Sequence, residues 1–155
     1  MQLGLESADQ SVLDAMGKGT RVEQNAIILE NLAEAGIGAF VYVLFGTPSE
    51  DHDAALRTRD FIALHARRIG FINVAVFNMP RKSEEATLYP TRDFYEGDLS
   101  LYHEFEHPKG WNRAEIRSFL SSEFESSEAI KTILHRNPPI FTSNHAPFFL
   151  DYLGN

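Results

Sequence analysis

The chain contains the stretch IGAFVYVLFGTPSED from Ile37 to Asp51, whose residue order indicates a strand followed by a turn and a helix. Residues 39–45 are seven uncharged apolar or aromatic residues, typical of a strand covered on both faces in a parallel sheet. The run ends at GTP, residues 46–48, and Ser49 is predicted to cap a helix. In α/β folds this edge of the sheet binds ligands. A plain strand-to-helix turn explains the same residues, so both interpretations stay open.

Strand and helix patterns alternate on both sides of this stretch. Residues 2–5 predict a short first strand, and FINVAVF at 71–77 predicts a further buried strand. Helices are predicted between the strands, one of them starting at a capping box of Thr20 and Glu23 and another covering 53–68. Crossovers long enough for a helix favour parallel strands. The first half is therefore predicted to be an α/β unit with a parallel βαβαβ sheet.

The second half has a different pattern. Residues 81–110 contain prolines, glycines and aromatic residues without steady periodicity, and predict a long irregular connection. A helix capped by Asn112 and a second helix ended by Asn137 are predicted next. We expect two regions: residues 1–80 form the sheet unit, and residues 81–155 form a mostly helical and irregular extension that packs on it.

The composition limits the classes of function. Fourteen basic residues against 22 acidic ones give a net charge of −8, and without a basic stripe we expect no nucleic-acid partner. No apolar run approaches the roughly 20 residues of a membrane span, and the polar start is not a signal peptide. We therefore expect a cytoplasmic protein without membrane contact. The absence of cysteine excludes disulfides and thiolate ligands within this chain.

The histidines suggest little chemistry. HEFEH at 103–107 lacks the HExxH spacing of a zinc helix. On a strand its two histidines would share a face and could bind a metal, but a solvated loop is the favoured interpretation. His65 is predicted at the surface or at an edge, and His145 in the tail has no identified partner. We therefore predict no catalytic residue and no metal ligand.

Polar or glycine residues follow each predicted strand at one edge of the sheet. Glu6 and Ser7 follow the first strand, residues 46–50 follow the second, and Asn78 follows the third. Glu6 and Ser7 could equally be helix caps. Three strand ends at one edge nevertheless form a stronger candidate site than any member alone.

These residues resemble a known family. LGLES at 3–7, followed by VLDAMGKGT at 12–20, resembles the fourth-strand segment of radical S-adenosylmethionine (radical SAM) Fe–S oxidoreductases. The likeness is closest to the branch that often carries an N-terminal cobalamin-binding domain. LFGTPSE at 44–50 resembles the fifth-strand pattern of that family, and residues 71–80 match its sixth strand. The resemblance covers about half of the chain, residues 2–80.

The resemblance implies a fold and a set of contacts. The family fold is a partial TIM-like (β/α)6 barrel, of which this chain would be the second half. Glu6 and Ser7 would lie near the ribose or methionyl end of S-adenosylmethionine, and Lys18 near its carboxylate. The adenine side would be shaped by residues 46–50, with an apolar contact from Leu44. The residues implied in S-adenosylmethionine binding are Glu6, Ser7, Lys18, Leu44, Gly46, Thr47, Pro48, Glu50, Phe77 and Asn78.

One departure from the family bears on activity. The family binds a [4Fe–4S] cluster through CxxxCxxC, whereas this chain has no cysteine. We expect an excised part of an enzyme that is inactive alone, with Met1 as an artificial start. Its partner would be the missing N-terminal half of the same polypeptide, and cobalamin would be a further cofactor of the whole enzyme. The exposed first strand could also form a homodimer.

Two other classes of function stay open. The chain could be a small stand-alone α/β module that binds a nucleotide or metabolite without catalysis. It could also be an interaction domain whose working surface is the aromatic C-terminal half.

Overall fold

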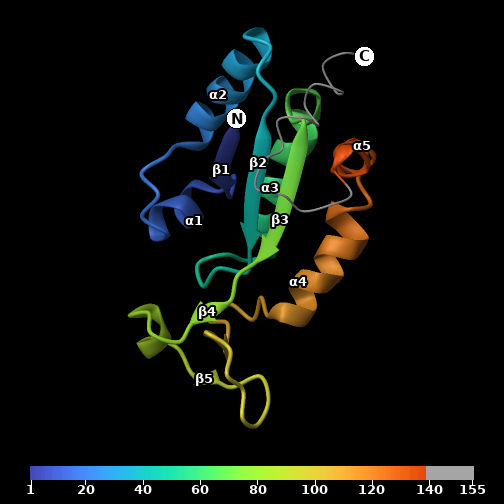
Figure 1. Cartoon of the computed structure of the whole chain (residues 1–155). Helices are drawn as coiled ribbons and strands as arrows, with labels where there is room; N and C mark the ends of the chain where they lie inside the picture. The colour runs from blue at the N-terminus through green and yellow to red at the C-terminus, as the bar shows by residue number, and fades with distance from the viewer. Residues whose placement is uncertain (139–155) are drawn as a thin grey trace.

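The computed structural model describes residues 1–138, and at its centre is a parallel sheet of three strands (Figure 1). The strands β1 (Gln2–Glu6), β2 (Phe40–Phe45) and β3 (Phe71–Val76) lie in the order β1-β2-β3. Phe40 lies opposite Gln2 on one side and Phe71 on the other. The α/β class and the parallel βαβαβ arrangement predicted from the sequence are therefore confirmed.

The helices of the first half are α1 (Gln10–Ala15), α2 (Val22–Glu34) and α3 (His52–Leu64), and a short 3-10 helix η1 (Ala66–Arg68) follows α3. Two predicted helix starts are wrong. The N-cap of α3 is Asp51, not Ser49, because the Asp51 carboxylate accepts from Ala54 N at 2.9 Å. The box at α2 lies one residue later than predicted, since the Gln24 side chain accepts from Arg21 N at 3.3 Å.

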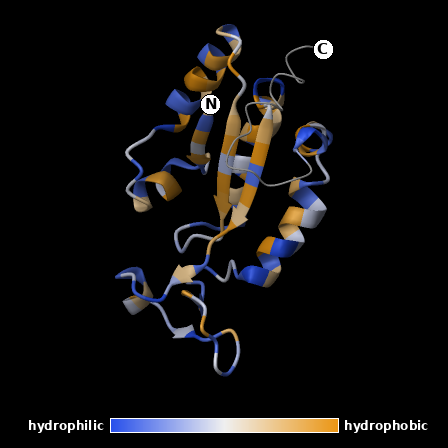
Figure 2. Ribbon diagram, in the orientation of Figure 1, coloured by the Kyte–Doolittle hydropathy of each residue, from blue (hydrophilic) through white to orange (hydrophobic). Residues whose placement is uncertain are grey.

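The core lies on one face of the sheet. Val41, Val43 and Phe45 of β2 join one apolar cluster with buried residues of both crossover helices, α2 and α3. Tyr42 and Leu44 alternate with them, point to the opposite face and are only half-buried. The predicted covering of β2 on both faces is therefore confirmed only in part, since Phe40, on the same face as Tyr42 and Leu44, is 4% exposed. Figure 2 shows that β2 is apolar along its length, which is why the sequence suggested two covered faces.

The segment predicted as irregular contains a second, small sheet. Its antiparallel strands are β4 (Met79–Pro80), β5 (Thr91–Arg92) and β6 (Tyr102–Phe105), in the order β4-β6-β5. A 3-10 helix, η2 (Glu85–Thr87), lies between β4 and β5. Figure 1 shows β4 and β5 beyond the carboxyl ends of β2 and β3. This sheet therefore extends the carboxyl edge of the parallel sheet.

Two helices follow, as the sequence predicted. They are α4 (Arg113–Phe119), which continues into a π-helical turn η3 (Leu120–Phe124), and α5 (Glu128–Arg136). Asn112 caps α4 by accepting from Ala114 N at 2.9 Å, which confirms the predicted cap. Both helices pack their apolar residues into the same core cluster, among them Phe119 and Ile133. The predictions for the tail, including His145, lie outside the described residues.

A helix that crosses a membrane needs about 20 predominantly apolar residues. None of the helices within residues 1–138 meets that requirement.

Candidate functional site

The carboxyl ends of β1, β2 and β3 meet at one edge, because the three strands are parallel. Glu6, residues 46–50 and Phe77 extend from this edge. A pocket of about 240 Å³ opens there. It is lined by Ala15, Met16, Thr47, Pro48, Ser49, Phe77, Glu85 and Tyr89. The structure thus brings Thr47, Pro48 and Phe77, three of the predicted residues, to one cavity.

Glu6 and Lys18 form an ion pair near this edge. Lys18 Nζ donates to Glu6 Oε1 at 2.9 Å, and both side chains keep contact with solvent. Glu6 has a backbone φ of 61°, a left-handed conformation that is uncommon for residues other than glycine. Strain of this kind is found at binding sites, where the surrounding structure holds it in place.

Ser7 has a different environment from Glu6. It is fully buried, and its hydroxyl lies 3.2 Å from the Thr58 hydroxyl of α3. The Ser7 oxygen also accepts from Asp9 N at 3.1 Å. Asp9 in turn caps α1 and bonds to Arg57 of α3 at 2.6 Å. Ser7 therefore fixes the turn between β1 and α1 onto α3.

Gly46 lies close to α4 in a backbone conformation that favours glycine. Its φ is 87°, and an added Cβ would lie 2.5 Å from Cδ1 of Ile116 on α4. Because the end of the Ile116 side chain can move, the positive φ is the stronger reason for a glycine at this position. The turn after β2 therefore packs directly against α4.

Glu50 is a buried carboxylate behind this turn. Its Oε2 accepts from Gly46 N and, at 3.0 Å, from Trp111 Nε1. Its Oε1 has no hydrogen-bond partner among the described residues. Burial is the largest influence and raises the pKa of Glu50 to about 7, against the two donors that lower it. Glu50 thus links the turn to the segment before α4 and does not line the 240 Å³ pocket.

The same segment holds the turn at two further points. His107 Nε2 donates to Thr47 O at 2.9 Å, while its Nδ1 accepts from Lys109 N at 3.2 Å. Burial lowers the pKa of His107, so its neutral form is favoured. Lys109 Nζ donates to Ser49 O at 2.6 Å and lies 2.9 Å from Asp51 Oδ2. Three side chains from residues 107–111 therefore fix the turn between β2 and α3.

Asn78 and Leu44 are placed differently from the pocket residues. Asn78 Oδ1 accepts from Arg113 Nη1 at 2.6 Å, and its Nδ2 donates to Val76 O at 3.2 Å. Asn78 therefore joins the end of β3 to α4. Leu44 lies on β2, on the half-buried face of the sheet opposite the core.

Two histidine predictions are wrong. The HEFEH segment is not a solvated loop, because residues 102–105 form β6 and His107 is buried. His65 is also buried, at 8% exposure, beside Phe61 and Arg68. Among residues 1–138 no group of three or more His, Cys, Asp or Glu could hold a metal.

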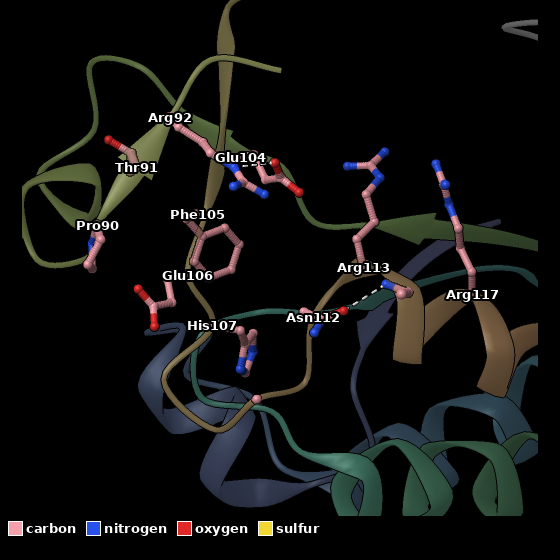
Figure 3. Close-up of a pocket in the computed structure, with 12 residues that line it drawn as sticks. Pro90, Thr91, Arg92, Glu104, Phe105, Glu106, His107, Asn112, Arg113 and Arg117 are labelled. Carbon is pink, nitrogen blue, oxygen red and sulfur yellow. Dashed lines mark hydrogen bonds and ion pairs between the residues drawn. The ribbon is translucent and has the colours of Figure 1, made fainter. Parts of the chain in front are cut away.

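The sequence did not reveal the contribution of the C-terminal half. His107 and Trp111 contact residues about 60 positions earlier in the chain, so no local pattern marks them. A further pocket, of about 680 Å³, lies between β5, β6 and α4 (Figure 3). This pocket was not predicted from the sequence, because strands β5 and β6, which line it, were not predicted.

Comparisons with family models, curated proteins and solved structures give no match for this chain.

Proposed function

We propose that this chain is the second half of a partial (β/α)6 barrel in a cytoplasmic radical SAM Fe–S oxidoreductase. In this proposal the carboxyl edge of β1, β2 and β3 contacts S-adenosylmethionine. The observation that carries the proposal is the 240 Å³ pocket at that edge, where Thr47, Pro48 and Phe77 meet. Ligands of parallel α/β folds bind at this edge.

The arrangement of the sheet also supports a barrel. Its order is sequential, β1-β2-β3, and both crossover helices pack on the same face. A doubly wound sheet has helices on both faces and reverses its strand order. A barrel keeps sequential order and has its helices outside, so the half-buried face of Tyr42 and Leu44 would look into the barrel.

The chemistry of the edge suits the two ends of S-adenosylmethionine. Phe77, Pro48 and Tyr89 offer apolar and aromatic surface for the adenine, and the Thr47 and Ser49 hydroxyls offer hydrogen bonds. Lys18 and Glu6 supply opposite charges, which match the carboxylate and the ammonium of the methionyl group. Gly46 and Glu50 hold the turn in shape from behind.

A [4Fe–4S] cluster does not fit the residues of this chain. The cluster needs thiolate ligands, and the sequence has no cysteine. In the proposal these ligands come from the N-terminal half of the same polypeptide. A cobalamin-binding domain would also lie outside this chain.

The chain itself can be tested with S-adenosylmethionine, followed by backbone amide NMR. The proposal expects saturable shifts at Thr47 and around Phe77, and weaker binding by at least about fivefold in Phe77→Ala, about 1 kcal/mol. Tyr95→Ala, which removes a ring that is 66% exposed outside this pocket, is the control. Shifts that never saturate, or that gather away from the edge, would refute the proposed contact.

The reading frame that encodes the chain gives a second test. A CxxxCxxC motif in frame before Met1 is expected, and the longer protein reconstituted with iron and sulfide should form 5′-deoxyadenosine from S-adenosylmethionine. Nucleoside binding by a protein without such cysteines would instead support a stand-alone binding module.

A further inference from the structure

The 680 Å³ pocket between β5, β6 and α4 contains uncompensated positive charge. Three arginines line it, namely Arg92, Arg113 and Arg117. Arg92 is neutralised, because its Nε donates to Glu104 Oε2 at 2.7 Å. The other two, Arg113 and Arg117, project side by side from α4 (Figure 3).

Arg113 and Arg117 have no acidic partner among residues 1–138. Arg113 is held by neutral groups, since Nη1 donates to Asn78 Oδ1 and the guanidinium lies 5.6 Å from the centre of the Phe94 ring. The Arg117 guanidinium has no hydrogen bond or ion pair within the described chain, and only the backbone O of this residue accepts a side-chain hydrogen bond, from Ser121 Oγ. Glu106 also lines the pocket, but Figure 3 shows it on the far side, away from both arginines.

The rest of the pocket suits a molecule with an apolar body. The Phe105 ring stands in the middle of the lining, and Pro90 adds apolar surface (Figure 3). Asn112 and Thr91 add hydrogen-bonding groups. A cavity of about 680 Å³ is within the usual range for small-molecule sites.

We propose that this pocket binds an organic anion, with its carboxylate or phosphate between Arg113 and Arg117 and its flat apolar body on Phe105. Guanidinium groups bind both anions through paired hydrogen bonds. In a protein of net charge −8, two arginines without acidic partners facing one cavity are best explained by a ligand that supplies the negative charge.

This pocket lies next to the carboxyl edge of the parallel sheet. Phe105, His107 and Arg113 line both it and a smaller cavity that reaches Gly46 and Phe77. If the proposed function holds, the anion is the substrate that reacts beside S-adenosylmethionine. Only this assignment rests on the proposed function; the binding of an anion does not.

Phenyl phosphate, benzoate and neutral benzyl alcohol are suitable probes for isothermal titration against the chain. At least one of the two anions should bind with an affinity that falls as salt rises, and the tighter one identifies the anionic group. Benzyl alcohol should bind at least about tenfold more weakly, which is 1.4 kcal/mol. Equal binding of benzyl alcohol, or no binding of either anion, would overturn the proposal.

Arg117→Gln should weaken binding of the tighter anion about tenfold, a loss of 1.4 kcal/mol. Arg67→Gln is the matched control, because Arg67 is also exposed but lies in η1 and does not line the pocket. An Arg117→Gln variant that binds like Arg67→Gln would also overturn the proposal. Met16→Ala separates the two proposals, because Met16 lines the 240 Å³ pocket and not this one. The variant should weaken binding of S-adenosylmethionine and leave binding of phenyl phosphate unchanged.

Discussion

At the scale of single residues, Glu50 has the least usual environment. Its Oε2 receives two N–H donors, from Gly46 and Trp111, and its Oε1 has none among the described residues. A fully buried carboxylate with one unpaired oxygen favours the protonated form, in which the charge is absent. Glu50 therefore makes the stability of the turn depend on pH.

The sign of this dependence follows from the direction of the shift. The pKa of Glu50 rises from its usual 4.5 to about 7 on folding, so the folded chain binds more protons between these values. The free energy of unfolding should therefore fall as pH rises through this window, by about 3 kcal/mol from this group.

Glu50→Gln should remove that part of the pH dependence, because glutamine keeps an acceptor for the two donors and carries no charge. Urea unfolding at pH 4.5 and at pH 8 measures this effect. From pH 4.5 to pH 8 the free energy of unfolding of the variant, taken relative to that of wild type, should rise by about 3 kcal/mol. Other titrating groups cancel in this difference. If the free energy of unfolding changes equally with pH in the two proteins, ionisation of Glu50 does not destabilise the fold.

Local sequence was sufficient for some residues of the site and not for others. Gly46 could be predicted because a glycine after an apolar strand marks a turn with an unusual backbone. The role of His107 could not be predicted, because the group that it binds, Thr47 O, lies 60 positions earlier in the chain. Residues 103–107 appeared to be polar loop, and only tertiary contact shows which imidazole is buried.

At the scale of elements, the same contrast separates the two sheets. Strands β2 and β3 have six residues each with strong apolar runs, so their existence could be predicted. Strands β4 and β5 have two residues each, which is too short for any alternation to show. Their pairing with β6 depends on contacts between distant segments, for which the sequence offers no periodic signal.

The end of α5 covers part of the outer edge of β3. The side-chain amide of Asn137 makes the two hydrogen bonds that a neighbouring strand would make to Ile72. Its Oδ1 accepts from Ile72 N at 3.0 Å, and its Nδ2 donates to Ile72 O at 2.8 Å. Arg136 adds bonds to the carbonyls of Ala66 and Ile69 just before the strand. One side-chain amide thus satisfies both backbone groups of a buried strand residue.

Asn137→Ala should destabilise the fold by about 1–3 kcal/mol, because it leaves the N–H and C=O of Ile72 without partners. Asn31→Ala, at an exposed position of α2, is the matched control and should change stability by less than about 0.5 kcal/mol. Urea unfolding gives both values, and hydrogen exchange at Ile72 should speed up in the first variant only. Similar stability of the two variants would show that β3 does not depend on this pairing.

At the scale of the whole molecule, the two edges of the parallel sheet differ. The edge at β3 is partly covered by Asn137, whereas β1 is the last strand on its side within residues 1–138. Met1 O accepts from Phe40 N, so by the alternation of a parallel ladder the backbone groups of Gln2 and Gly4 point outward. In a partial barrel this is the edge that the preceding strand would pair with.

An open strand edge binds another strand when one is available. We therefore predict that the chain alone forms a homodimer through β1, which light scattering after size-exclusion chromatography would detect as a mass that rises with concentration. Gln2→Pro removes an outward N–H and should restore the monomer, whereas Gln2→Ala keeps that N–H and should still form the dimer. A monomer at every concentration, with rapid amide exchange at Gln2 and Gly4, would show that β1 does not pair with a second copy.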